Sequence, residues 1–433
     1  MKQLLAYCLS IILCVSFTGC MENYLDLYPE DKITSASFPE NESDIKLLLN
    51  GVYAQLREKE VYNQGLFGFG ITDGATPNAF NWGTDEVFNK LGAGRLSSSD
   101  GGVVTYRWKR CYEIISRANY LLACMDLVDL SEEAKAKYSG ETHFLRGLAY
   151  SVLAETYGGV PIILTNISTE EARSLKRASL EETWQQALDD YEVAITNLGV
   201  DAPEPGRATK GAALGMKMRA YLYQGKYKEV LACVEQIDAL KKYGLFHSYE
   251  GLFDPANENN KEVLFDIQYI EGENSQGSYI DQYCGTGTGS WTRGSRYVPT
   301  DDLVAAYETI DGSPVDPENP YENRDPRLGF TAVLPGSYFL GYRFPNYLYP
   351  GGAFNHAGNR LKHLSTRKYR IQDESKLPPS GQSYINDIIL RYADVLLSKA
   401  EAIIETNGNV ADAIAILNRI RTERDDVKIS LLP

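Results

Sequence analysis

The chain has 433 residues, of which 43% are hydrophobic and 23% are charged, as is usual for a folded protein with a large core. Its 58 acidic side chains outnumber its 43 basic ones, and the formal net charge is −15. This charge argues against a protein that binds nucleic acid or anionic lipid through broad electrostatic attraction.

The N-terminus predicts a lipoprotein signal peptide over residues 1–19. Lys2 precedes an apolar run at residues 4–17, which is too short to span a bilayer but typical of a secretory signal. The run ends in Phe-Thr-Gly-Cys, which resembles a lipobox, so we expect Cys20 to be lipidated. A lipidated Cys20 would anchor a folded protein to a membrane surface without spanning it. Plain secretion and an uncleaved anchor are the alternatives.

Helical periodicity begins at residues 43–57, where apolar residues form one stripe. It stops at residues 62–105, a stretch rich in Gly, Asn, Thr and Ser. Irregular segments of this length are usually functional or disordered. Residues 106–127 return to a helical pattern.

The next predicted helix starts after Ser131, a favoured N-cap residue, and runs into residues 141–163. Apolar pairs recur there every four residues, which places them on one broad helix face. The opposite face carries Arg146, Tyr150 and Glu155. Gly158 suits the end of the helix, and Pro161 predicts an extended exit. A helix that buries so wide a face requires other helices around it.

Further helices are predicted at residues 180–198, 209–224 and 227–240. The last two are joined at Gly225 in a pattern typical of tetratricopeptide helix pairs. A second copy of this pattern lies at residues 394–402 and 411–421, with Gly408 between them. The copies are too far apart for an uninterrupted solenoid.

Residues 254–379, between the two copies, contain many Gly, Pro and Asn residues and predict an irregular part with a short strand at residues 262–269. The run GTGTGS at residues 285–290 matches neither dinucleotide-binding nor Walker motifs, and a flexible loop is the better interpretation. The cluster RDPR at residues 324–327 predicts an Arg–Asp network that fixes a turn, with catalysis as the alternative.

Enzyme and metal motifs are absent from the sequence. It contains no HExxH, no GxSxG and no paired cysteines, and its four histidines are scattered. We therefore expect no catalytic residue, no metal and no cofactor. A pair of catalytic carboxylates, as in glycosidases, is the alternative, but the sequence alone does not identify such a pair among the 58 acidic residues. The cysteines that follow Cys20 are irregularly spaced and are predicted to be small buried hydrophobic residues: Cys111, Cys124, Cys233 and Cys284.

Aromatic side chains in the irregular segments are the best candidates for ligand binding. An indole or phenol ring can cover the apolar face of a sugar, while amide and guanidinium groups bond its hydroxyls. The predicted ligand-binding residues are Asn81, Trp82, Tyr283, Trp291 and Arg293, with Arg296 and Tyr297 beside them. The alternative for each tryptophan is that it only anchors its own loop.

Several motifs together resemble the SusD/RagB family of outer-membrane nutrient-binding lipoproteins, and they extend over nearly all of the mature chain. The motifs are Cys20 with YLDLYP at 24–29, FLRGLAY at 144–150, GGVP at 158–161, AYLYQGKY at 220–227, DG at 311–312, NRDPRL at 323–328, DIILRYADVLL at 387–397, AEA at 400–402 and LNRIR at 417–421.

The resemblance implies a mainly α-helical fold, in which tetratricopeptide-like helix pairs pack against a loop-rich, irregular ligand-binding part with minor β structure. It divides the mature chain into an N-terminal part, residues 20–225, and a C-terminal part, residues 226–433. Family members usually continue beyond the LNRIR helix, so we expect the C-terminal part to be truncated. The family's ligand site corresponds loosely to residues 79–84 and 283–297.

We therefore predict a lipid-anchored protein of the cell outer membrane that faces outside, binds oligosaccharide and delivers it to a partner TonB-dependent transporter. We expect no enzymatic activity and no nucleic-acid partner. A peptide-binding member of the same family, a helical scaffold for protein partners and a secreted glycosidase are the alternatives.

Overall fold

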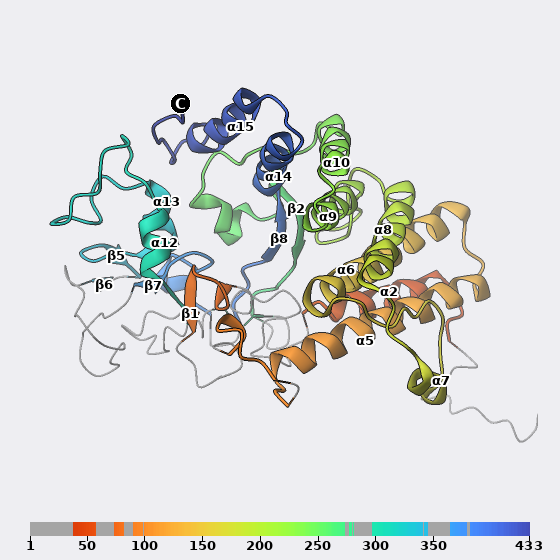
Figure 1. Ribbon diagram of the computed structural model, residues 1–433. Coiled ribbons are helices and arrows are strands. Elements are labelled where there is room, and N and C mark those ends of the chain that lie inside the picture. The colour runs from red at the N-terminus through yellow and green to blue at the C-terminus, as the bar shows by residue number, and fades with distance from the viewer. Residues whose placement is uncertain are drawn as a thin grey trace, which may run out of the picture.

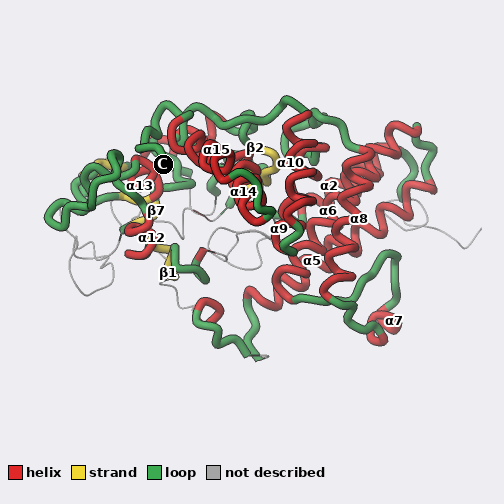
Figure 2. Tube along the Cα trace, turned by 45° about the horizontal axis from the view of Figure 1, so that its top comes forward, coloured by secondary structure: helices red, strands yellow, loops and turns green. Residues whose placement is uncertain are grey.

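The computed structural model describes residues 38–57, 73–81, 90–97, 99–272, 277–278, 280, 297–340, 342–344, 364–378 and 382–433. Most of the helices gather on one side of the molecule, and the loops with their short strands lie on the other (Figures 1 and 2). Within the described residues, no helix is long and apolar enough to cross a membrane.

The helical side is a stack in which each helix packs mainly against the next. The last two helices join this stack through α10, although the irregular part separates them from it in sequence. The stack consists of α2 (Glu42–Ala54), α5 (Val103–Cys124), α6 (Glu132–Tyr157), α8 (Leu180–Asn197), α9 (Lys210–Tyr223), α10 (Tyr227–Ala239), α14 (Tyr392–Glu405) and α15 (Val410–Thr422). The predicted helices and the mainly α fold with tetratricopeptide-like pairs are confirmed.

Local sequence signals fix the ends of these helices. Ser131 caps α6 by accepting a hydrogen bond from the backbone N–H of Ala134. Gly158 ends α6 with φ 75°, and Gly225 turns the chain between α9 and α10 with φ 66°. Ser179 and Glu182 form a reciprocal capping box at the start of α8. These interactions explain why helix boundaries could be read from the sequence.

Helix α6 is buried on more sides than its sequence pattern indicates. The face expected to be polar is in contact with neighbouring helices, and only Glu155 of its three residues is exposed. Arg146 is buried and its Nη2 lies 2.7 Å from Oδ1 of Asp190 on α8. The Tyr150 hydroxyl accepts a hydrogen bond from the Ile163 N–H at 2.8 Å. A helix in the middle of a stack has neighbours on both sides, and its polar residues are tolerated there because they are paired.

A two-stranded antiparallel sheet joins the helical stack to the irregular part. Its strands are β2 (Val263–Ile267) and β8 (Asp387–Arg391), and both contact α9. The strand expected at residues 262–269 is confirmed. Its apolar side chains belong to the same core cluster as those of the helices, and Phe265 packs against Phe144 of α6 at 4.8 Å between ring centroids.

The irregular part contains short elements and paired strands. They are β1 (Ala79–Asn81), β3 (Tyr297–Pro299), α12 (Asp301–Ala306), α13 (Pro326–Thr331), β4 (Ala332–Val333), β5 (Tyr338–Phe339), β6 (Tyr342–Arg343) and β7 (Ser365–Thr366). A separate short helix, α7 (Thr169–Ser174), projects from the helical side (Figure 1). The irregular part has a small apolar cluster of its own, formed by Val333, Phe339 and Phe344.

The RDPR cluster is a turn-fixing network, as predicted. Asp325 caps α13 by accepting from the Arg327 N–H and also pairs with the Arg327 guanidinium at 2.6 Å. Arg324 donates to three backbone carbonyls, those of Pro320, Val304 and Tyr307. Cys111, Cys124 and Cys233 are buried free cysteines, as expected, and Cys284 lies outside the described residues.

Candidate functional site

Two segments that are distant in sequence meet in a short antiparallel ladder. Strand β1 pairs with β3, and in this register Ala79 is opposite Pro299 and Asn81 is opposite Tyr297. The Thr300 N–H extends the contact by donating to the Asn78 carbonyl at 3.1 Å. The start of one predicted ligand-binding segment, residues 79–84, therefore pairs with the end of the other, residues 283–297.

Most of the predicted site residues lie outside the described residues. This applies to Trp82, Tyr283, Trp291 and Arg293, and also to the lipidation residue Cys20. For Asn81 the structure describes the backbone in β1 and not the side chain. These assignments stay predictions. The pairing of Asn81 with Tyr297 could not be predicted from sequence, because it depends on a long-range contact rather than a local pattern.

Behind this ladder lies a cluster of aromatic and basic side chains. Strand β3 contacts β7, which leads directly into Lys368 and Tyr369. The Lys368 ammonium lies 4.6 Å from the Phe253 ring centroid, 4.8 Å from that of Tyr369 and 5.7 Å from that of Tyr249. Burial opposes its charge, but Tyr249 and Tyr369 hold the pKa of Lys368 above its ordinary value. The aromatic rings thus keep a cation in place beside the β1–β3 ladder.

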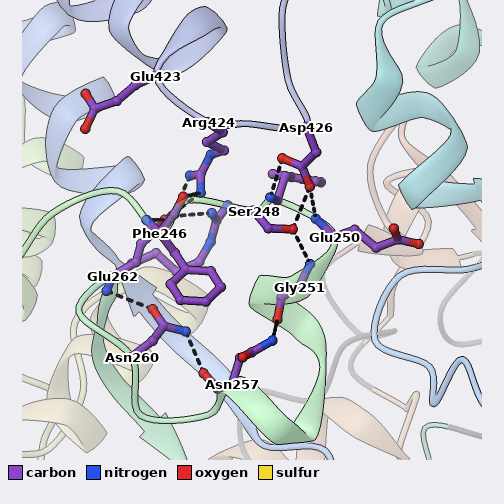
Figure 3. A network of polar contacts seen from close by, with 12 residues as sticks. Phe246, Ser248, Glu250, Gly251, Asn257, Asn260, Glu262, Glu423, Arg424 and Asp426 are labelled. Carbon is purple, nitrogen blue, oxygen red and sulfur yellow. Dashed lines mark hydrogen bonds and ion pairs between the residues drawn. The ribbon is translucent and has the colours of Figure 1, made fainter.

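A second polar cluster, shown in Figure 3, ties the end of the chain to the centre of the molecule. Glu262 is fully buried and accepts from both terminal nitrogens of Arg424, at 2.7 and 2.8 Å. Asp426 accepts from the N–H groups of Tyr249 and Glu250 at 2.8 and 2.9 Å. Each charge is satisfied by a neighbour, so this cluster stabilises the fold and holds the Tyr249 ring in position rather than forming a site.

A cavity of about 340 Å³ lies where the ends of four helices meet β8. The start of α5, the end of α6, the start of α8 and the end of α9 all contribute to its wall, so these ends face the same side. The wall of the cavity includes Arg107, Glu155, Trp184, Tyr223, Tyr369 and Asp387. Asp73, which precedes β1, is also in the wall and connects the cavity to the segment that carries the predicted site.

Two other cavities, of about 420 and 460 Å³, share the segment of residues 204–207. Tyr53 lines the cavity of about 420 Å³. Its hydroxyl donates to Glu141 at 2.8 Å and accepts from the Ala208 N–H at 2.9 Å. The Arg207 guanidinium covers the Tyr53 ring at 4.9 Å. These contacts attach the loop before α9 to α2 and α6. Among the described residues, no group of three or more His, Cys, Asp or Glu could hold a metal ion.

Two family models match different parts of the chain. A model described as the SusD family matches residues 261–424, and one described as starch-binding and associating with the outer membrane matches residues 23–222. A SusD-like protein of Formosa agariphila is 26% identical over 457 residues, which cover 97% of this chain and 81% of that protein.

Solved structures share the fold. A SusD-like carbohydrate-binding protein of Bacteroides fragilis superposes with a TM-score of 0.79 at 26% identity, over 90% of this chain and 80% of that one. A structure with bound xylogluco-oligosaccharide superposes with a TM-score of 0.67 at 22% identity, over 89% and 76% of the two chains. At this identity the second likeness shows the fold alone.

Proposed function

The chain belongs to the SusD/RagB family, and from this premise we propose that it binds oligosaccharide at the outer membrane and passes it to a TonB-dependent transporter. In this proposal Cys20 carries the lipid anchor, the folded part faces outside, and the protein presents its ligand without cleaving it. The matching family model is described as starch-binding and associating with the outer membrane, which supports both the ligand class and the location.

The observation that carries the ligand assignment is the pairing of Asn81 with Tyr297. In the sequence, Trp82 follows Asn81 and Arg296 precedes Tyr297. An aromatic and a guanidinium residue thus flank the paired positions in sequence, and this is the combination that covers the face of a sugar and bonds its hydroxyls.

Trp291 and Arg293 lie on the same side of this junction in sequence. Arg293 is four residues before Tyr297. We propose that Trp82 and Trp291 form a stacking platform, with Asn81, Tyr283 and Arg293 as further contacts. The carbohydrate-binding protein from Bacteroides fragilis, with its shared fold, supports a saccharide as the ligand.

The test is calorimetry of the mature protein against xyloglucan, laminarin and starch oligosaccharides, with Trp291→Ala and Trp82→Ala beside the wild type. We expect each variant to weaken binding tenfold or more, because an aromatic contact at a binding hot spot is worth about 1–3 kcal/mol. Tyr338→Ala is the matched control, because Tyr338 is an exposed aromatic residue of the irregular part outside the two segments. It should bind as the wild type does.

Other outcomes would each contradict a different part of the proposal. Equal oligosaccharide affinity in the wild type and both tryptophan variants would show that the two tryptophans do not form the binding site. Binding of peptides alone would make the protein a peptide-binding member of the family. Cleavage of any glycan would contradict the non-enzymatic assignment. The proposed transporter partner is tested by copurification with the tagged protein from its native membrane after gentle solubilisation. If no TonB-dependent transporter copurifies, the proposal that the protein delivers its ligand to such a transporter would be contradicted.

A further inference from the structure

Two polar groups in the wall of the cavity between the helix ends and β8 have no partner among the described residues. Asp387 is 5% exposed, and within the described part of the chain its carboxyl group has neither a hydrogen-bond donor nor an ion-pair partner. The Nε of Arg107 is buried and likewise has no acceptor among the described residues. Buried polar groups are normally satisfied, so two such groups on one cavity indicate that its contents complete them.

The other charged groups near the cavity do not supply these partners. Arg219 reaches the wall, but its Nη2 is paired with Asp394 at 2.7 Å. Glu155 and Asp73 also line the cavity, but both are exposed to solvent. Among the charged residues of the wall, this leaves the Asp387 carboxyl group as a buried acceptor and the Arg107 Nε as a buried donor.

A ligand that satisfies both groups must donate to one and accept from the other. A hydroxyl group does both, and a sugar ring carries several of them around an apolar face. The cavity wall also supplies aromatic surface for that face, from Trp184, Tyr223 and Tyr369. A volume of about 340 Å³ is at the lower end of small-ligand pockets, which suits one sugar unit rather than a chain.

The charge state of Asp387 favours a neutral ligand over a cation. Burial, with a smaller contribution from Asp266, raises the pKa of Asp387 to about 8. At neutral pH the group is then largely uncharged, so it offers a hydroxyl and a carbonyl rather than a full negative charge. A neutral carboxyl group attracts an ammonium ion less strongly than a carboxylate does, but it can still form hydrogen bonds with a sugar hydroxyl.

We propose that this cavity is a second saccharide site, which takes a single sugar unit between Asp387 and Arg107. The inference rests on the proposed function in one respect, the choice of saccharide as ligand class. The residues that make this site are distinct from the predicted stacking platform, so the two can be tested separately.

The experiment uses the mature protein and four monosaccharides as separate probes: glucose, galactose, mannose and xylose. Binding is measured by saturation-transfer NMR and calorimetry. The variants are Asp387→Leu, which keeps a side chain of similar size but removes both carboxyl oxygens, and Tyr223→Ala, which removes a half-exposed ring of the cavity wall. We expect at least one monosaccharide to bind the wild type and each variant to weaken that binding tenfold or more. Asp412→Asn, on the exposed face of α15, is the matched control and should leave binding unchanged.

The outcomes separate this inference from the proposed function. Trp82→Ala and Trp291→Ala should keep monosaccharide binding in the cavity while they lose oligosaccharide binding. If no monosaccharide binds the wild type, or if Tyr223→Ala and Asp387→Leu both bind as the wild type does, the second site is wrong even where the stacking platform holds. If free amino acids bind through Asp387 and monosaccharides do not, the cavity takes a zwitterion and the proposal is also wrong.

Discussion

The helical stack and the irregular part are stabilised in different ways. The stack shares one apolar cluster that runs from α2 to α14 and includes the inner residues of β2 and β8. Among the described residues, the irregular part has a small apolar cluster of three buried residues, and it also contains buried polar links, such as those from Arg324 to three carbonyls and from Glu262 to Arg424. A helix with its caps is specified locally, whereas these polar links are specified by residues distant in sequence.

Removal of the central carboxylate should have the largest effect on stability. Glu262 accepts from Arg424, from Arg391 at 2.9 Å and from the Phe246 N–H at 2.7 Å. Glu262→Ala leaves the 2%-exposed Arg424 unpaired, and breaking a buried pair in this way costs about 3–5 kcal/mol. The free energy of unfolding in denaturant measures the loss.

Glu308→Ala is the matched control for Glu262→Ala. Glu308 pairs with Arg421 at 2.6 Å, but its side chain is 54% exposed. Exposed pairs contribute about 0–1 kcal/mol, so the control should unfold almost as the wild type does. Equal losses in the two variants would contradict the distinction between buried polar links and surface pairs.

Leu148→Ala probes the core of the stack and should cost slightly less. Leu148 is fully buried in α6, and truncation of a buried leucine costs about 2–5 kcal/mol. Leu397→Ala is the control, because Leu397 is exposed on α14, and its change in the free energy of unfolding should stay within about 0.5 kcal/mol. A change near zero for Leu148→Ala would contradict the assignment of α6 as the centre of the core.

The sequence specified the stack well because its signals are local. Ser131, Gly158 and Gly225 each act within a few residues, and the structure has the helix ends where they predict. Burial of Arg146 was not predictable, because its partner Asp190 lies on another helix and no periodic pattern encodes the pair. Strand β8 was missed for the same reason: residues 387–391 form a strand because β2 is beside them.

The candidate site shows the same limit. Composition indicated irregular stretches at residues 62–105 and 254–379, and the family resemblance pointed to residues 79–84 and 283–297 within them. The pairing of Asn81 with Tyr297, which brings these two segments together, is visible only in the structure. The cavity could not be predicted from the sequence, because Arg107 and Asp387 are far apart in the chain and neither belongs to a catalytic or ligand-binding motif.

The pH dependence of stability tests the junction between the two regions. Burial raises the pKa of Asp266 to about 6 and of Glu258 to about 7, and burial together with Asp266 raises that of Asp387 to about 8. The folded state therefore holds protons that the unfolded state has released, and stability falls as pH rises through about 4 to 8. Denaturant unfolding should show a less stable wild type at about pH 8.5 than at about pH 5.5.

Asp387→Asn should flatten this pH dependence, because the amide does not titrate. The carboxyl of Asp100, which Lys90 and Ser97 hold at a pKa of about 2, acts at lower pH and does not obscure the window. Stability that rises between neutral and alkaline pH would show that the buried carboxyls of this junction are charged in the folded state.

A smaller effect on stability is expected from the two capping boxes, which both consist of a Ser and a Glu. Ser179 and Glu182 cap α8, while Ser168 and Glu171 cap α7. Helix α8 packs into the core, whereas none of the residues of α7 is buried. Ser179→Ala should lower the free energy of unfolding by about 1 kcal/mol, as loss of an N-cap usually does. Ser168→Ala should unfold α7 locally and leave the global value unchanged. Equal global losses would mean that α7 contributes to the cooperative unit.

The smallest effect on the fold, and the clearest effect on location, is expected for Cys20→Ala. The first described residue is Phe38, and the core cluster starts at Ile45. Cys20 precedes in sequence every residue of the described core cluster, so we expect the free energy of unfolding to stay the same. The proposed anchor depends on this one thiol, and a protein without it should move from the membrane fraction to the soluble fraction.

Cys233→Ala is the control, because Cys233 is buried and free. It should alter stability and not location, and a Cys20→Ala protein that still sediments with outer membrane after a salt wash would show that the anchor lies elsewhere.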